Sequence, residues 1–517
     1  MAYACPARLR LAEVISALSL ATDLGLGQPL AHALRTCVFA LRLGRALSLS
    51  DRGLADIYYT TLLRFIGCTS ESHELLAFTA GDDVGFRHVM VAVGNDTPAE
   101  IAAHLTRFMT AVEVHSDVRG IRDALESDVG LGAQLAAAHC EVATMLATRL
   151  GLGATVCNAL AHAFERWDGR GFPGGRSGEE IPLPVRVAVV ARDIEVLTRT
   201  EGVEQMRDAF RRRRDRSYDP RLVDAFFEHR GDVLAPVDDR TIWDDVLRAE
   251  PGGPVWIPSE RIDAALTAFA DFADAKTPFT LDHSRRVAEL AETAARDLGL
   301  SSHDSTAVRR GALLHDIGRS GIANAIWEQR GALSVAQWER VRLHVYYTER
   351  ILAHCDDLRA LCALASSHHE RLDGSGYHRG TRGADLDMPA RVLAAADACQ
   401  AMLQERPHRP ARKLDDVVRE LRRESSSGRL DGRVVEAVLA AAGAPAGRPS
   451  GTNPAKLTDR EVEVLRLMAR GHSNREMARS LNITPKTVGH HVQHIYDKIG
   501  VSTRAAAAVF AVENHLL

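Results

Sequence analysis

The chain has 517 residues, a net charge of −4 and an apolar fraction of 46%. That length suffices for about three domains of ordinary size, and the apolar fraction excludes wholesale disorder. The charge excludes a globally basic surface for nucleic acid, and no segment has the ~18 uninterrupted apolar residues of a membrane span. Eight cysteines without a CxxC pair indicate reduced thiols, and the abundance of Ala and Arg is typical of a GC-rich bacterial gene. We therefore expect a bacterial, cytoplasmic protein that contacts no membrane.

Most of the chain has the apolar periodicity of amphipathic helices. Residues 282–299 place apolar side chains at i, i+3 or i+4 and i+7 with charged residues between them, and residues 186–197 continue that period. Some strand-like alternation occurs in 79–96. Residues 443–456 are rich in Gly, Pro and Ser and lack periodicity, which indicates a linker. The pattern predicts a fold that is mostly all-α.

The sequence contains a tandem repeat. The segment AFERWDGRGFPGG at 163–175 returns as HHERLDGSGYHRG at 368–380, and three intervals of 32, 24 and 29 residues are identical in both copies. In the later copy these intervals run from His283 to His315, from His344 to His368 and from His368 to Asp397. Such self-similarity indicates duplicated structural units. We predict a first copy at 9–235, with an insertion inside 69–138, and a second copy at 259–442.

The second copy carries residues that suit a metal centre. They are His283, His315, Asp316, His344, His368, His369 and Asp397. Imidazoles and carboxylates without a thiolate favour two divalent transition-metal ions, Fe or Mn first and Zn as a third candidate. A carboxylate such as Asp316 can bridge two ions, and paired ions activate a water and neutralise a phosphate. The separate dipeptide His303-Asp304 is expected from chance alone at this composition.

The first copy lacks this ligand set. Its matching positions are Arg64, Phe65, Ala163, Phe164 and Arg192, and only the imidazoles of His32 and His139 remain. Two imidazoles cannot hold two ions, and an arginine repels a cation. We predict that the first copy binds no metal and serves as a scaffold docked on the second.

The second copy resembles the HD-GYP family of HD-domain phosphohydrolases. The resemblance lies in GALLHDIGRSGI (311–322), HHERLDGSGYHRG (368–380), RVLAAADA (391–398) and RPHR (406–409). It implies a helical bundle that hydrolyses cyclic di-GMP and whose metal ligands are the seven residues given above. It also implies catalytic roles for Asp316 and Arg319 and substrate contacts from Arg319, Tyr377, Arg406 and Arg409.

Three positions of the second copy depart from the family pattern. Arg319 stands where the family usually has Lys, which keeps a cation but changes its shape. His378 stands in place of the Pro of GYP. Phe279 occupies a position where some members carry a Glu for a third metal.

The last 61 residues, 457–517, contain three helix starts with explicit caps. Thr458 with Glu461 and Ser473 with Glu476 form capping boxes, and Thr484 precedes a proline at the first helical position. The short turn between the last two of these helices predicts a helix-turn-helix. The second helix would enter the major groove of double-stranded DNA.

This tail resembles the LuxR-type helix-turn-helix, a four-helix module. The resemblance implies groove-facing positions at Thr487, Gly489, His490 and Gln493, and phosphate-facing positions at Lys486, His491, His494 and Lys498. Gly489 stands where the family usually has Lys. The small apolar residues of 502–514 suit packing between two copies, so we expect a homodimer on DNA.

Three functions remain open from the sequence. The first is a transcription regulator that binds DNA and carries a metal-dependent phosphodiesterase domain. The second is a nucleotide or metal sensor without turnover that controls DNA binding. The third is primarily a cyclic-dinucleotide phosphodiesterase. All three predict a cyclic dinucleotide or another phosphoester as ligand.

Overall fold

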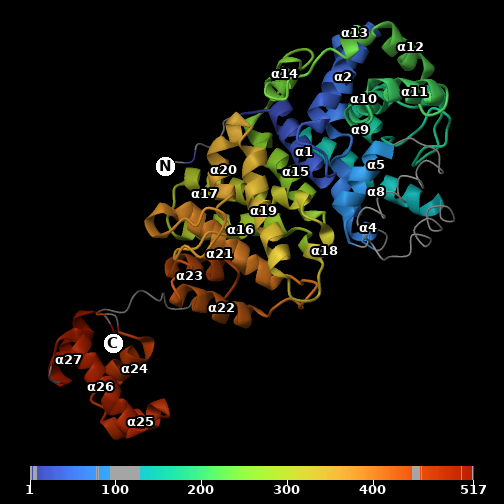
Figure 1. The fold of residues 1–517 in the computed structure, drawn as a ribbon. Coiled ribbons are helices and arrows are strands. Elements are labelled where there is room, and N and C mark those ends of the chain that lie inside the picture. Colours follow the sequence, from blue (N-terminus) through green and yellow to red (C-terminus); the bar gives the residue numbers. More distant parts are fainter. Residues whose placement is uncertain are drawn as a thin grey trace. The chain divides into compact units, whose positions relative to one another are not determined.

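The computed structural model describes residues 3, 8–76, 79, 81–93, 129–444, 455, 457–501, 504–514 and 516. The chain forms two compact units, Met1–Pro445 and Ala446–Leu517. Helices dominate both (Figure 1), and the sheet found in the described residues is a two-stranded antiparallel pair of β1 (Leu9–Arg10) and β2 (Trp256–Ile257). The predicted all-α class is confirmed. No helix in these ranges is long and apolar enough to cross a bilayer.

The first copy supplies the earlier helices of the larger unit. They are α1 (Leu11–Gly25), α2 (His32–Ala46), α3 (Asp51–Leu63), the 3-10 helix η1 (Ile66–Glu71), α4 (Ser72–Leu75), α5 (Asp83–Val93), α8 (Val129–Leu150), α9 (Ala154–Leu160), η2 (Gly178–Glu180), α10 (Leu183–Thr200), α11 (Val203–Arg213), α12 (Pro220–Glu228) and α13 (Arg230–Val233). The helix α14 (Ile242–Arg248) leads to β2 and the second copy.

The second copy repeats much of this order. Its elements are η3 (Ser259–Arg261), α15 (Ile262–Asp274), η4 (Pro278–Thr280), α16 (His283–Asp297), α17 (Ser302–Leu314), η5 (Ile317–Gly321), α18 (Asn324–Trp327), α19 (Val335–Leu352), η6 (Asp356–Leu358), α20 (Arg359–Ala365), η7 (Gly383–Asp385), α21 (Met388–Leu403), α22 (Leu414–Ser426) and α23 (Gly432–Ala441). Both copies lie in one compact unit, so the domain boundaries at 9–235 and 259–442 stay predictions.

The start of the second long helix has the same backbone in both copies. Ala31 and Asp282 adopt the left-handed conformation, with φ of 74° and 63°, directly before the histidine that begins the helix. A buried aspartate nine residues earlier, Asp23 or Asp274, accepts a hydrogen bond from the backbone N–H that follows that histidine. The duplication inferred from the spacings is therefore visible in local geometry.

The repeated glycine-rich loop is also built alike in the two copies. In each, one buried glutamate accepts two backbone N–H groups of the loop, at positions nine and eleven residues later. Glu165 accepts from Gly174 and Arg176 at 2.8 and 3.0 Å. Glu370 accepts from residues 379 and 381 at 2.8 and 2.9 Å. These carboxylates fix the loop against the histidine positions that precede it.

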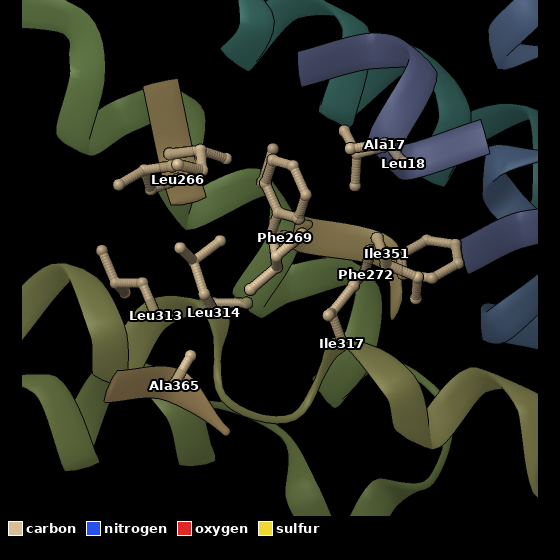
Figure 2. Close-up of a cluster of buried hydrophobic side chains, with 14 of the residues drawn as sticks. Ala17, Leu18, Leu266, Phe269, Phe272, Leu313, Leu314, Ile317, Ile351 and Ala365 are labelled. Carbon is tan, nitrogen blue, oxygen red and sulfur yellow. The ribbon is translucent and has the colours of Figure 1, made fainter. Parts of the chain in front are cut away.

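A single apolar core joins the two copies (Figure 2). Leu18 on α1 belongs to the same buried cluster as Phe269 and Phe272 on α15 and as Ile317 and Ile351 of the second copy. Removing this apolar surface from water favours the packed arrangement of both copies. The pairing of β1 with β2 attaches the segment that leads into the second copy to the start of the first.

The strand-like reading of 79–96 was wrong. Residues Asp83–Val93 form the helix α5, and residues 94–128 of the predicted insertion lie outside the described residues. The short alternation of apolar residues also fits a helical period. In the helix, Asp83 and Arg87 lie at i, i+4 and form a buried ion pair, with Nη1 and Oδ2 2.7 Å apart.

The same helix contacts the second copy. The buried carboxylate of Asp83 accepts hydrogen bonds from Lys276 Nζ at 3.1 Å and from the backbone N–H of Asn324 at 2.6 Å. Charge on Lys276 and Arg87 holds the pKa of Asp83 below its ordinary value although burial opposes it. The helix α5 of the first copy thus holds the start of α18.

We expect residues 250–442, expressed alone, to unfold at a lower temperature than the full chain, because Phe269, Phe272 and Ile317 would lose their apolar cover. Thermal unfolding followed by circular dichroism measures the difference. Removal of 457–517 is the matched control and should leave the main transition unchanged, since that part is a separate unit. A fragment as stable as the full chain would contradict the scaffold role of the first copy.

Candidate metal centre and nucleic-acid interface

The seven predicted ligands come together inside the second copy. His283 begins α16, His315 and Asp316 follow α17, His344 lies in α19, His368 and His369 follow α20, and Asp397 lies in α21. They form three overlapping groups in which the ligand atoms lie within 4.8 Å of one another. Six of the seven side chains are buried, and His369 is partly exposed. Residues separated by 114 positions therefore share one polar site.

Asp316 lies at the middle of this cluster. Its Oδ1 is 3.6 Å from His344 Nε2 and 3.7 Å from His368 Nε2, and its Oδ2 is 3.4 Å from His315 Nε2. Its two oxygens face different imidazoles, as a bridging carboxylate requires.

Asp397 joins the remaining two histidines. Its Oδ1 lies 3.2 Å from His283 Nε2, and its Oδ2 lies 3.7 Å from His369 Nδ1. The cluster therefore has room for separate groups of ligands around two ions.

Three of the histidines have their ring orientation fixed in the same way. His315, His344 and His368 each donate from Nδ1 to the backbone carbonyl three residues earlier. This leaves Nε2 unprotonated with its lone pair toward the cluster. His315 Nε2 is buried without a hydrogen-bond partner. A buried polar atom without a partner is unfavourable, so the residues present fit a metal.

The electrostatics favour the metal-binding protonation states. Burial lowers the pKa of His368 to about 3 and also lowers the pKa of His344. Burial opposes ionisation of Asp316, but the charge of Arg319 helps to hold the pKa of Asp316 well below its ordinary value. Neutral imidazoles and ionised carboxylates are the forms that ligate metals.

Arginines and aromatic rings surround the cluster. Arg319 Nη1 donates to Asp316 Oδ2 at 2.9 Å, and its guanidinium lies 4.1 Å from the centre of the Trp327 ring. The Tyr377 ring lies 4.7 Å from the His369 ring at 32°. Burial, with Arg319 nearby, lowers the pKa of Arg406 to about 10. Sequence reasoning missed Trp327, because no motif or repeated interval marks it.

Arg409 is bound differently from the other predicted substrate contacts. Its guanidinium donates to the backbone carbonyls of Ala401, Met402, Gln404 and Pro410. These bonds hold the chain after α21 and favour a structural role over the predicted contact with substrate.

His378, which stands in place of the Pro of GYP, also has an interaction partner. His378 Nε2 lies 2.6 Å from Glu349 Oε2, and Arg379 binds the same carboxylate. The loop is thereby attached to α19, the helix that carries His344.

The residues at the matching positions of the first copy make hydrogen bonds with one another and with neighbouring groups. Arg64 donates from Nε and Nη2 to the carbonyl of Ala163, and both ring nitrogens of His139 face acceptors, Glu71 and the carbonyl of Arg64. His32 Nδ1 lies 2.6 Å from Glu195. Among the described residues, the groups of three or more potential ligands all lie in the second copy.

The C-terminal unit has the predicted helix starts. It contains α24 (Asp459–Ala469), α25 (Asn474–Leu481), α26 (Pro485–Ile499) and α27 (Arg504–Glu513), drawn in red in Figure 1. Both capping boxes are formed, and Thr484 accepts from the backbone N–H of Thr487. Asn482, with φ of 54°, ends α25 and sets the turn before α26.

The predicted DNA-contacting residues lie along α26. Lys486, His490, Gln493 and His494 are exposed, while Thr487, Gly489 and His491 are half-buried. Lys498 also lies on this helix, but its Nζ is 2.6 Å from Glu461 Oε2, so its predicted phosphate contact competes with an internal ion pair. Gln493 likewise donates to Asp497.

Comparison with known proteins agrees with both sites. The HD domain family matches residues 133–222 and 267–434, which lie in both copies, and the family of bacterial regulatory proteins of the luxR type matches 455–511. The fold and the site define an HD-domain phosphodiesterase joined to a LuxR-type DNA-binding domain.

The relatives narrow this class further. The 3′3′-cGAMP-specific phosphodiesterase 3 of Vibrio cholerae is 31% identical over 411 residues, which is 79% of this chain and 89% of that protein. A crystal structure of a cyclic GMP-AMP specific phosphodiesterase from V. cholerae has a TM-score of 0.56 at 27% identity and covers 84% of this chain and 98% of that one. The cyclic di-GMP phosphodiesterase of Thermotoga maritima is 35% identical over 158 residues, 30% of this chain and 42% of that protein. The chain belongs to the HD-GYP family of metal-dependent phosphodiesterases.

We expect protein prepared without oxygen to carry about two transition-metal ions per chain. His315→Ala with Asp316→Ala should remove them, because two of the three ligand groups lose residues. His303→Ala with Asp304→Ala changes the same dipeptide on α17, away from the cluster, and should leave the metal content unchanged. Metal analysis by plasma mass spectrometry tests this, and less than one ion in the unaltered protein would contradict the site.

We expect Gly489→Lys to strengthen DNA binding. A Cβ at this position meets no atom within 4 Å, so the side chain fits on α26, and each added phosphate contact steepens the salt dependence of log K by about 0.9. Gly489→Ala is the control, since it adds only helix propensity, about 1 kcal/mol. Fluorescence anisotropy over a series of salt concentrations separates the two effects. Equal salt slopes in both variants would show that a lysine at the groove-facing position 489 neutralises no phosphate.

Proposed function

We propose that this protein is a DNA-binding regulator whose second copy hydrolyses a cyclic dinucleotide. The observation that carries the proposal is the cluster of seven ligands around Asp316, combined with a LuxR-type domain in the same chain. A recognition helix adds little to an enzyme that acts only on a diffusing nucleotide. Its presence favours a role in transcription over one in nucleotide breakdown alone.

The seven residues would hold two ions, Fe or Mn first and Zn as the third candidate. Bound there, the ions would supply an activated water and charge for the phosphate. The Nδ1 bonds to backbone carbonyls keep the rings of His315, His344 and His368 turned toward the cluster. Arg319 and Arg406 would face the phosphate and stabilise negative charge that develops during cleavage.

We propose 3′3′-cyclic GMP-AMP as the first substrate to test. The V. cholerae relative named for that nucleotide aligns with 79% of this chain, whereas the Thermotoga relative named for cyclic di-GMP aligns with 30%. The longer alignment, with the V. cholerae relative, includes part of the first copy, so the resemblance extends beyond the copy that carries the proposed metal ligands. Cyclic di-GMP, implied by the family motifs, is the second candidate.

A sensor without turnover is the alternative. It is favoured by Arg319, which stands where the family usually has Lys and which binds Asp316 directly. In that case the metal site would bind a cyclic dinucleotide and alter DNA binding without cleaving it. We also propose that the regulator binds DNA as a homodimer, because LuxR-type recognition helices read paired half-sites.

We expect full-length protein loaded with Mn or Fe to open the ring of 3′3′-cyclic GMP-AMP faster than that of cyclic di-GMP. Arg319→Ala should lower kcat by about 10²-fold, because it removes a charge that faces the phosphate. Chromatography of the products measures both rates. His303→Ala with Asp304→Ala is the control and should act like the unaltered protein. Bound metal without turnover of either nucleotide would contradict hydrolysis and favour the sensor.

A further inference from the structure

Two arginines occupy the former ligand positions of the first copy. Arg64 and Arg192 match His315 and Asp397, whose Nε2 and Oδ1 atoms lie 3.9 Å apart in the second copy. Both guanidinium groups are buried, and each arginine has an exposed fraction of 3%. The guanidinium groups of the first copy thus lie at the positions that correspond to two of the proposed metal ligands of the second.

The hydrogen bonds of these arginines are incomplete. Among the residues that the structure describes, Arg64 donates from Nε and Nη2 to the carbonyl of Ala163 and has no partner for Nη1. Within the same residues, Arg192 donates from Nη1 to the carbonyl of Val91, and its buried Nη2 has no partner. Buried donors of a charged group without acceptors are strongly unfavourable. Each arginine therefore has an N–H group free for one more acceptor.

The surrounding carboxylates do not supply those acceptors. Asp193 lies 2.5 Å from Arg192 Nε but is shared with the hydroxyl of Tyr218 and with Arg213. Burial and the charge of Arg192 lower the pKa of Arg64 to about 9, which reflects positive charge that its neighbours do not balance.

A second carboxylate, Glu195, is used elsewhere. It binds His32, Arg35 and Arg199 through both of its oxygens. The two buried guanidinium groups therefore have one shared carboxylate between them.

We propose that the former metal centre of the first copy is an anion site that binds a phosphate group. Guanidinium donors match phosphate oxygens in geometry and in charge. The phosphate would come from inorganic phosphate or from a nucleotide. This site is separate from the hydrolysis proposed for the second copy and does not depend on it.

Binding there would act on α5. Arg192 contacts the carbonyl of Val91 near the end of this helix, and Asp83 at its start binds Lys276 and the N–H of Asn324 in the second copy. A phosphate that draws the Arg192 guanidinium toward itself competes with its bond to α5. The site is therefore placed to influence the second copy.

The test is thermal unfolding of full-length, metal-loaded protein with increasing inorganic phosphate at constant ionic strength, with GMP as a second ligand. A ligand that binds only the folded protein raises the unfolding temperature, and the increase grows with the ratio of ligand concentration to Kd. We expect phosphate to raise it in the unaltered protein and in Arg212→Met, which changes an exposed arginine on α11. Arg192→Met and Arg64→Met should lose the phosphate-dependent increase, and Arg192→Lys should keep part of it.

One further variant tests whether the phosphate binds to the second copy instead. His315→Ala with Asp316→Ala should retain the increase, because those residues lie in the other centre. If GMP raises the unfolding temperature, inorganic phosphate does not, and Arg192→Met abolishes the increase with GMP, then the bound phosphate group comes from a nucleotide. No increase in the unaltered protein, or an equal increase in Arg192→Met, would overturn the proposal. The measured quantity is the change caused by phosphate, so a lower starting stability of a variant does not obscure the result.

Discussion

The apolar contact between the first and second copies is the constraint on which the metal centre depends. Ile317, directly after Asp316, lies in the same buried cluster as Leu18 of α1 and Phe272 of α15. The backbone that presents His315 and Asp316 is thus fixed by side chains from both copies. A site of seven ligands needs such support, because an error of about 1 Å in one ligand weakens metal binding and catalysis.

Local contacts complete what the shared core begins. The carbonyl bonds of His315, His344 and His368 set their tautomers, and the carboxylate of Glu370 holds the loop that follows His369. These contacts need only residues close in sequence. The core sets where the helices lie, and the local bonds set how each ring turns.

The fold class, the duplication and the ligand set could be predicted because they leave periodic or repeated marks in the sequence. Helical periodicity marked α10 and α16, and equal intervals marked five of the seven positions that the fold brings together. Contacts between segments without a repeat could not be predicted. Nothing in the sequence connects Asp83 with Lys276, or Trp327 with Arg319, because these pairs depend on tertiary packing. The error in 79–96 arose because a short apolar alternation fits a strand and a helix equally well.

One glycine in each copy shows how little of the backbone changed when the first copy lost its ligands. A Cβ on Gly318 would lie 2.1 Å from the carbonyl oxygen of His344, and a Cβ on Gly67 would lie 2.1 Å from that of His139. Both copies therefore still bring the same two chain segments into contact. The segments approach so closely that only a glycine, which has no Cβ, fits at this position. At this contact, the two copies differ in side chains and not in the path of the backbone. The loss is in principle reversible, and the first copy offers an existing framework on which a second metal centre could be engineered.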